Sequence, residues 1–297
     1  MVRPAVRIGV DLGGSKIEAV VLDDAGIIRG HTRVATPRAG GYEAITAAIA
    51  TLVAHLEAQV QIRCTIGIGT PGAISHTTGA IKNSNTTCLN GRPLQQDLEQ
   101  LLGRPIRLEN DANCLALSEA RDGAARDHGC VFAVILGTGV GGGLVINKTL
   151  WSGRQRIAGE WGHNTLDPQG PDCYCGHRGC VETLLSGPGL VADYQKHGGD
   201  RTLDAPALVA AARKGEPLAA ASLHRYGERL GRALSVVVNI LDPDIIVLGG
   251  GLSTVPEIYA QGRRALAAWA FTDDCVTPIV PAAHGPASGV RGAAHLW

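Results

Sequence analysis

The chain has 297 residues, with equal numbers of basic and acidic side chains and only 4% aromatic residues. This length is sufficient for two lobes with separate cores. A formal net charge of zero and so few aromatic rings argue against a nucleic-acid-binding surface. No apolar run approaches the roughly 20 residues of a membrane-spanning helix, and no signal peptide opens the sequence, so we expect a cytoplasmic protein with no membrane partner.

The first elements predicted along the chain are short strands joined by a glycine turn. An apolar run at 6–10 leads into Asp11-Leu12-Gly13-Gly14-Ser15, and a second run at 17–22 follows at once. So little space between the runs favours a β-meander. The backbone N–H groups of the turn suit a phosphate, and Asp11 at the strand end suits Mg²⁺. An ordinary hairpin turn explains the same residues equally well.

The next segment predicts a helix at 42–59, a strand at 65–69, a short strand at 106–108 and an Ala/Leu-rich helix ending near 120. Asn110 and Asp111 lie at the junction of that strand and that helix. Such residues most often cap a helix. The functional alternative is that Asp111 accepts the proton of an attacking hydroxyl group, as phosphoryl transfer requires.

A second glycine-turned meander is predicted in the other half of the chain. It has a strand at 131–136, a turn at 137–143 and a returning strand at 144–146. The turn formally matches the dinucleotide fingerprint, but a strand follows where that fingerprint requires a helix. We therefore expect a hairpin that grips the β- and γ-phosphates. Two such meanders predict a duplicated fold with two related lobes.

The remaining signals lie in the second half. His163, Cys173, Cys175 and Cys180 form a complete Cys₃His set for a structural Zn²⁺, with free thiols as the alternative. We do not expect His177 to be a ligand. The chain is largely helical after 180, and a buried strand at 245–248 leads into Gly249-Gly250-Gly251, which is either a nucleotide-binding turn or a plain strand–helix connection.

Several of these motifs occur in the order seen in the ROK family (repressors, open reading frames, kinases), which the whole chain resembles. They are DLGGSK, GTPG, ENDANCLALSEA, ILGTGVGGG, GEWGHN, CYCGHRGCVE and VLGGG. The resemblance implies an α/β protein with the actin-like, ribonuclease-H-like ATPase fold, two lobes around a cleft. The lobes would be 1–113, completed by 285–297, and 114–284, which carries the zinc-binding loop.

The resemblance also implies the roles of individual residues in an ATP-dependent sugar kinase. Asp111 is the base, and Asn85, Asn110, Glu160, His163 and Glu182 bind the sugar. The residues implied for Mg-ATP are Asp11, Gly13, Gly14, Ser15, Lys16, Thr138, Gly139, Gly250 and Gly251. His163, Cys173, Cys175 and Cys180 hold zinc, so that His163 binds the metal through one ring nitrogen and the sugar through the other.

Segments 81–94 and 237–253 look most like the manno(fructo)kinase branch of the family, so we expect a fructokinase, with mannose as a second substrate. The segment 284–294 is shared with the N-acetylglucosamine kinases, and these or a glucokinase are the alternatives. Three positions depart from the pattern: Ser15 replaces Thr, Cys88 replaces a Trp, and the stretch between His163 and Cys173 is short.

The same family includes repressors and sugar-sensing regulators. Repressors carry a helix-turn-helix domain before the first phosphate motif, and the ten residues before Asp11 are too few for one. We therefore expect an enzyme, and a homodimer, as is usual in the family.

Overall fold

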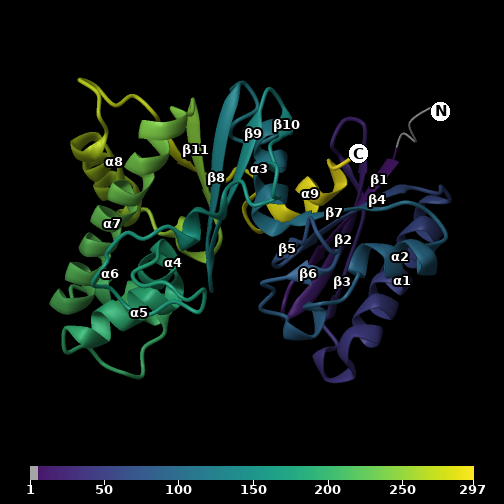
Figure 1. Ribbon diagram of the computed structural model, residues 1–297, viewed down its shortest axis with the longest axis horizontal. Coiled ribbons are helices and arrows are strands. Elements are labelled where there is room, and N and C mark those ends of the chain that lie inside the picture. The colour runs from purple at the N-terminus through teal and green to yellow at the C-terminus, as the bar shows by residue number, and fades with distance from the viewer. Residues whose placement is uncertain (1–5) are drawn as a thin grey trace.

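The computed structural model describes residues 6–297 as two lobes, each built on a five-stranded sheet (Figure 1). The predicted first lobe begins at residue 1, and its residues 1–5 lie outside this description. Its sheet has the order β3-β2-β1-β4-β7, with an antiparallel meander followed by parallel strands. The strands are β1 (Val6–Leu12), β2 (Lys16–Asp23), β3 (Ile28–Ala35), β4 (Thr65–Thr70) and β7 (Arg107–Asn110).

The second sheet repeats this arrangement in the order β10-β9-β8-β11-β12. Here too a three-stranded antiparallel meander precedes two parallel strands. The strands are β8 (Cys130–Leu136), β9 (Val140–Ile146), β10 (Thr149–Leu150), β11 (Ile245–Gly249) and β12 (Ile279–Pro281). The predicted duplication is therefore confirmed, strand for strand.

Helices cover the outer faces of both sheets. In the first lobe α1 (Gly41–Val60) buries Ile45, Ile49, Leu52 and Leu56, a helical spacing of apolar residues, and α2 (Leu94–Leu102) packs beside it. The second lobe carries α4 (Val181–Leu185), α5 (Gly187–Lys196), α6 (Ala205–Arg213), α7 (Pro217–Leu241) and α8 (Glu257–Trp269). Within residues 6–297, no helix has the length and apolarity to cross a membrane.

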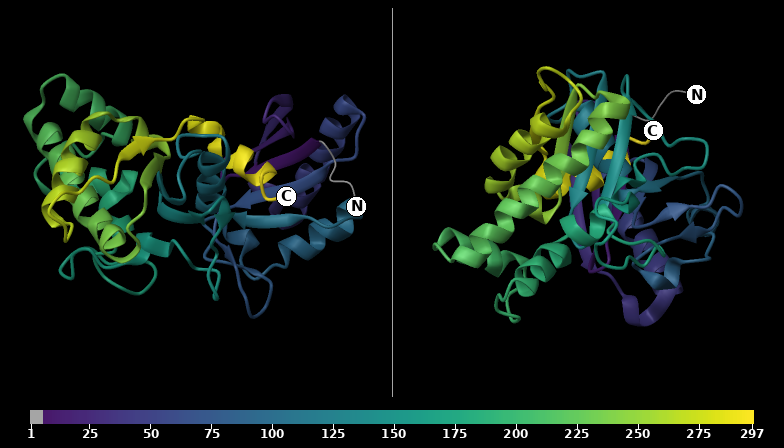
Figure 2. Two further views of the ribbon diagram at one scale, coloured as in Figure 1. Left: turned by 90° about the horizontal axis from the view of Figure 1, so that it is seen from above. Right: turned by 60° about the vertical axis from the view of Figure 1, so that its left-hand side comes forward.

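Two helices lie between the sheets and connect the lobes. α3 (Asp111–Arg121) packs on β8 and β9, whereas α9 (Ser288–Ala294) returns to the first lobe and packs on β1 and β4 (Figures 1 and 2). The approach is so close that a side chain on Gly9 or Gly67 would overlap carbonyl oxygens of α9. Only glycine permits this contact between strand and helix.

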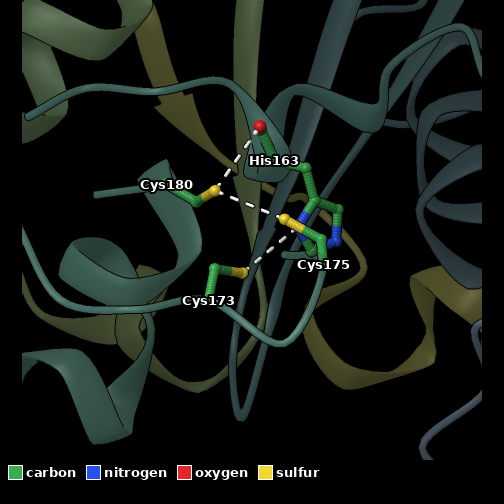
Figure 3. Close-up of side chains that lie close together, drawn as sticks. All are labelled: His163, Cys173, Cys175 and Cys180. Carbon is green, nitrogen blue, oxygen red and sulfur yellow. Dashed lines mark hydrogen bonds between the residues drawn. The ribbon is translucent and has the colours of Figure 1, made fainter. Parts of the chain in front are cut away.

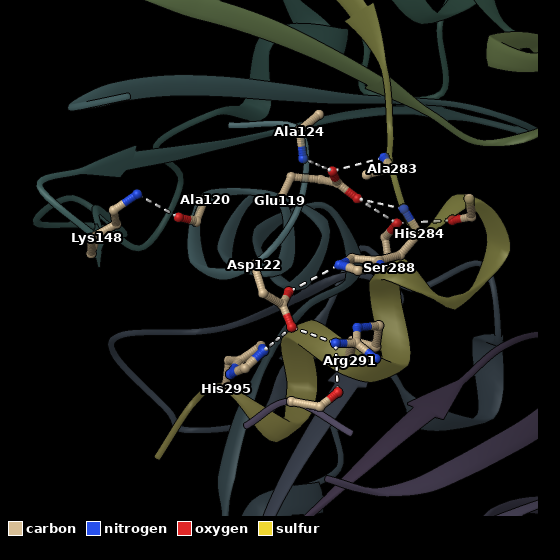
Figure 4. Close-up of polar contacts among 12 residues, drawn as sticks. Glu119, Ala120, Asp122, Ala124, Lys148, Ala283, His284, Ser288, Arg291 and His295 are labelled. Atoms are coloured by element: carbon tan, nitrogen blue, oxygen red, sulfur yellow. Dashed lines mark hydrogen bonds and ion pairs between the residues drawn. The ribbon is translucent and has the colours of Figure 1, made fainter. Parts of the chain in front are cut away.

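The C-terminal end of α3 is joined to α9 by a set of polar contacts, the junction cluster, formed by Glu119, Asp122, His284, Ser288 and Arg291 (Figure 4). The fully buried Glu119 carboxylate accepts hydrogen bonds from the backbone N–H groups of Ala124, Ala283 and His284 and from the Ser288 hydroxyl. Asp122 pairs with Arg291 and, at 3.0 Å, with His284. Arg291 also donates to the Gly26 carbonyl in the β2–β3 turn.

Two sequence predictions differ from the structure. The turn predicted at 137–143 is shorter, because β9 already begins at Val140. Gly142 and Gly143 lie inside the strand, where any side chain would overlap the carbonyl oxygens of Gly159 and Ala112. The turn after β11 leads first into a 3₁₀ segment, Gly251–Thr254, before α8 begins.

Several short elements are not predicted from the sequence: the hairpin β5 (Ala73–Ile74) with β6 (Ile81–Lys82), the strand β12 and the helix α9.

Candidate active site

A cavity of about 1070 Å³ lies between the two lobes, with residues of both in its lining. The first lobe supplies the hairpin β5–β6 and the end of β7. The second lobe supplies the turn between β8 and β9, a 3₁₀ segment (Glu160–His163) and α4. The cavity brings together these predicted site residues: Asn85, Asn110, Asp111, Thr138, Gly139, Glu160, His163 and Glu182.

Asp111 is the first residue of α3, but the role of helix cap belongs to its neighbour. The Asn110 side-chain oxygen accepts from the N–H groups of Ala112 at 2.8 Å and Asn113 at 3.3 Å, and its amide donates to the Gly72 carbonyl. The Asp111 carboxylate accepts one N–H, from Ala112 at 2.8 Å. Asp111 therefore lines the cavity with most of its hydrogen-bonding capacity unused.

The electrostatics of Asp111 suit a proton acceptor at neutral pH. Burial raises its pKa to about 7, and the nearby carboxylates of Asp11 and Glu160 add to the effect. Burial likewise raises the pKa of Asp11 to about 6, although Lys16 opposes the shift. Two neighbouring, half-buried carboxylates with raised pKa values are an arrangement that recurs at active sites.

The first glycine turn lies beside this carboxylate pair. Its closing hydrogen bond runs from the Gly13 N–H to the Lys16 carbonyl. The lining of the cavity includes Asp111 but none of the predicted residues from Asp11 to Lys16. Lys16 forms an ion pair with Glu18 on its own strand. Arg38, which was not among the predicted site residues, fills the space next to Gly14 and places a cation at the turn.

The second glycine turn separates the cavity from a neighbouring one. Gly137 and Thr138 line both the large cavity and a pocket of about 750 Å³ whose walls are mostly apolar, with Val191, Val209, Leu252 and Val255 among them. The predicted Gly251 lines this pocket as well. Gly250 does not; its positive φ brings the chain close to the Leu136 carbonyl. The Glu182 carboxylate accepts the Val140 N–H at 2.9 Å and so holds the turn.

The predicted metal ligands converge at the edge of the large cavity (Figure 3). One ligand atom from each of His163, Cys173, Cys175 and Cys180 lies within 4.8 Å of the others. The Cys175–Cys180 sulfur distance is 3.6 Å, and the Cys173 sulfur lies 3.7 Å from His163 Nδ1. A tetrahedron with bonds of about 2.3 Å to sulfur has edges of roughly 3.8 Å, so the four groups fit Zn²⁺.

Two further side chains of the cavity were not anticipated. Tyr174 projects from the cysteine loop, and its hydroxyl lies 3.1 Å from His163 Nε2. Lys82 on β6 also lines the cavity and counters the effect of burial on the raised pKa of Glu160. The position of Tyr174 between two predicted ligands was the one sequence signal available. Lys82 lies in the segment 81–94 that resembles the manno(fructo)kinases, but its strand was not predicted and so its position in the cavity was not either.

Comparison with known proteins identifies the family. Residues 7–297 match the family model described as the ROK family. The chain is 39% identical to an N-acetyl-D-glucosamine kinase of Yersinia pseudotuberculosis serotype O:1b, over 97% of both chains, and 40% identical to one of Citrobacter koseri, over 97% and 98%.

Solved structures agree with this result. A ROK hexokinase from Thermus thermophilus superimposes with a TM-score of 0.85 at 33% identity, covering 98% of this chain and 97% of its own. A ROK family glucokinase from Streptomyces griseus, in complex with glucose and AMPPNP, gives 0.83 at 32% identity over 98% of both chains. The chain therefore belongs to the ROK family and has the predicted actin-like ATPase fold.

Proposed function

We propose that the protein transfers the γ-phosphoryl group of ATP to a hydroxyl group of a hexose, with Asp111 as the base. The observation that carries this proposal is the Asp111 carboxylate itself. It lies in the cavity between the lobes, the charged groups that act on it among the described residues are the carboxylates of Asp11 and Glu160, and its pKa is raised to about 7. A base of that pKa can orient a hydroxyl group and accept its proton at neutral pH.

The two glycine turns and the pocket beside them offer a site for the nucleotide. The mostly apolar pocket next to Thr138 and Gly251 has the size and character to receive the base and ribose. The phosphates would then lie along the second turn toward Asp111. Asp11 is the candidate Mg²⁺ ligand, since a carboxylate oxygen suits this ion, and Mg²⁺ would supply charge stabilisation of the phosphates.

The predicted sugar ligands surround Asp111 in the same cavity. Asn85 and Asn110 approach from the first lobe, and Glu160, His163 and Glu182 from the second. Glu182 also accepts the N–H of Val140, so its carboxylate connects the sugar side of the cavity with the phosphate-binding turn. Zinc held by His163 and the three cysteines would fix the orientation of the imidazole.

For the substrate we propose N-acetylglucosamine. The support comes from relatives at 39–40% identity over nearly the whole chain, which carry that activity in their names. The fructokinase expected from sequence resemblance is not confirmed, and fructose stays as the second candidate. It is favoured by the segment 81–94, which lines the cavity through Lys82, Asn83, Ser84 and Asn85. Cys88, the departure from that branch, packs against the first-lobe core instead.

The experiment is a comparison of kcat/KM for N-acetylglucosamine, fructose, mannose and glucose with Mg-ATP, with Asp111→Asn as the inactive control. A clear lead for N-acetylglucosamine supports the proposal, and a lead for fructose replaces the substrate while leaving the reaction intact. Absence of phosphorylation with all four sugars would overturn the proposed activity.

We also propose a homodimer formed through the second lobe. Val236 and Ile240 on α7, Trp269 at the end of α8, and Phe271 and Val276 beyond it expose apolar surface, with Phe271 almost fully accessible. The ends of α7 and α8 are joined by a hydrogen bond from the Phe271 N–H to Asn239. Sedimentation velocity of wild type and Phe271→Asp tests this: a dimer that becomes a monomer supports it, and a monomeric wild type contradicts it.

A further inference from the structure

Tyr174 occupies an unusual position in the cysteine loop. It stands between two candidate zinc ligands, Cys173 and Cys175, yet its own side chain turns into the cavity that contains Asp111. The Tyr174 residue is 72% exposed, which is high for a large aromatic group. Its edge-on contact with the His163 imidazole has ring centroids 5.2 Å apart. The side chain is therefore held by one ring contact and one hydrogen bond rather than by a packed core.

The contact with His163 determines what that imidazole can bind. Nδ1 lies 3.7 Å from the Cys173 sulfur and so faces the metal cluster. Nε2 is the remaining ring nitrogen, and it lies 3.1 Å from the Tyr174 hydroxyl. With both nitrogens engaged, His163 has no free position for a sugar hydroxyl group until Tyr174 moves.

We propose that the Tyr174 hydroxyl holds the sugar-binding position of His163 in the sugar-free enzyme and thereby sets the affinity for the sugar. This inference rests on the proposed function. A phenolic hydroxyl and a sugar hydroxyl offer His163 Nε2 the same hydrogen bond, so the incoming sugar exchanges one partner for another. The sugar therefore gains less binding free energy from this contact than it would from an imidazole whose Nε2 was unoccupied.

The loop permits the side chain to leave without disturbing the cluster. Its backbone is fixed by the Cys173 N–H, which donates to the His177 carbonyl at 2.8 Å, and by the Gly176 N–H, which donates to the Cys173 carbonyl at 3.0 Å. Rotation about the Tyr174 side-chain bonds moves the ring into solvent while the cysteines stay in place. Tyr174 is thus a positioning residue, separate from the chemistry at Asp111.

The test is Tyr174→Phe, which keeps the ring and removes the hydroxyl. We expect the KM and the ATP-free dissociation constant for the sugar to fall roughly three- to tenfold, the equilibrium worth of one neutral hydrogen bond. We expect kcat and the KM for ATP to stay within twofold. Tyr42→Phe is the matched control, because it removes a hydroxyl that binds Asp97 away from the cavity. A sugar KM that is unchanged or higher in Tyr174→Phe overturns the proposal.

A second measurement separates this proposal from the proposed reaction. In ¹⁵N-histidine-labelled protein without sugar, the Nε2 resonance of His163 should shift in Tyr174→Phe and stay in place in Tyr42→Phe. An unshifted resonance shows that the hydroxyl does not hold Nε2 in solution and overturns the proposal even in an active kinase. If the wild type phosphorylates no sugar, the proposed function fails, and the resonance still reports on the contact.

Discussion

The carboxylates at the two ends of α3 lie in opposite hydrogen-bonding environments. At the N-terminal end, Asp111 lies in a cavity with a single N–H donor, and burial and neighbouring carboxylates raise its pKa to about 7. At the C-terminal end, Glu119 is fully buried, whereas Asp111 is half-buried, and Glu119 accepts four hydrogen bonds. Asp122, one turn further, is surrounded by Arg291, His284 and His295. The hydrogen-bonding capacity of the carboxylate is mostly unused at one end of the helix and fully used at the other.

This difference separates stability from function along one short helix. A buried carboxylate that lacks donors destabilises the folded protein and is retained where it serves a reaction. A buried carboxylate with a full set of donors fixes the surrounding segments in place. We infer that Asp111 serves the reaction, whereas the junction cluster holds α3, α9 and the β2–β3 turn together.

The largest expected effect comes from breaking the reactive end. Asp111→Asn should lower kcat by roughly 10²–10⁴, because the amide cannot accept the proton of the attacking hydroxyl. The thermal unfolding temperature should not fall, since a buried and poorly compensated charge is lost. Steady-state kinetics and calorimetry on the same preparation check both parts. A variant with wild-type kcat would show that Asp111 is not the base.

Breaking the saturated end should have the reverse signature. Glu119→Gln replaces one carboxylate oxygen by an NH₂ group, which faces the N–H groups of residues 124 and 283 in one amide orientation and the N–H of residue 284 in the other. We expect the free energy of unfolding to fall by about 2–3 kcal/mol. The kcat of the folded enzyme should stay close to wild type. Urea denaturation measures the loss, with the exposed Glu228→Gln on α7 as the control. A loss no larger than that of the control would contradict a structural role for Glu119.

The pH dependence of activity should report the reactive end. With a pKa near 7 in the free enzyme, Asp111 becomes protonated as the pH falls, so kcat/KM should decline about tenfold per unit below that value. The plateau should lie above pH 7. The measurement is a profile of kcat/KM for the sugar from pH 5.5 to 8.5, with Mg-ATP held well below its KM so that the free enzyme is the titrating form. A profile that is flat across this range would mean that no group with this pKa controls the reaction.

The pH dependence of stability should report the other end. Burial alone would raise the pKa of Asp122, but His295 and Arg291 hold it well below its usual range. A lowered pKa in the folded state gives stability that is present above the unfolded value near 3.8 and is lost as the pH falls below it. Asp122→Asn should therefore be less stable than wild type at pH 7, and the difference should shrink toward pH 3. A constant difference over that interval would exclude this origin.

The expected effect of metal removal is independent of the contrast between the two ends of α3. Chelation, or Cys175→Ser, should raise the sugar KM severalfold and lower the unfolding temperature, because His163 loses the partner that orients it. The KM for ATP should change least, since the pocket proposed for the nucleotide lies on the other side of the Gly137–Thr138 turn. Metal analysis must verify the loss. Unchanged sugar KM and stability after verified loss would count against a zinc site.

Much of this arrangement was accessible from the sequence, for identifiable reasons. The apolar runs of β1, β2, β8 and β11 are continuous because those strands are buried on both faces, and the glycine turns mark their ends. The Cys₃His set was visible because three of its members lie within eight residues. The lobe boundary between 113 and 114, with 285–297 in the first lobe, stays a prediction.

Other features depend on contacts that sequence spacing does not encode. β5, β6 and β12 have two or three residues each, too few for a periodic pattern. Asn110 and Asp111 are neighbours with similar capping preferences, so only the structure distinguishes the residue that caps α3 from the one that faces the cavity. The approach of Arg38 to Gly14 joins residues that are far apart in sequence and carry no shared motif.

The return of α9 to the first lobe has a consequence for the order in which the protein can be made. β1 and β4 emerge early from the ribosome, but the helix that covers them spans residues 288–294. Until those residues are synthesised, the faces around Gly9 and Gly67 stay open to solvent, while most of the second lobe is already complete. The first lobe to be translated is therefore the last to close, and during synthesis its exposed strands are prone to aggregation until α9 covers them.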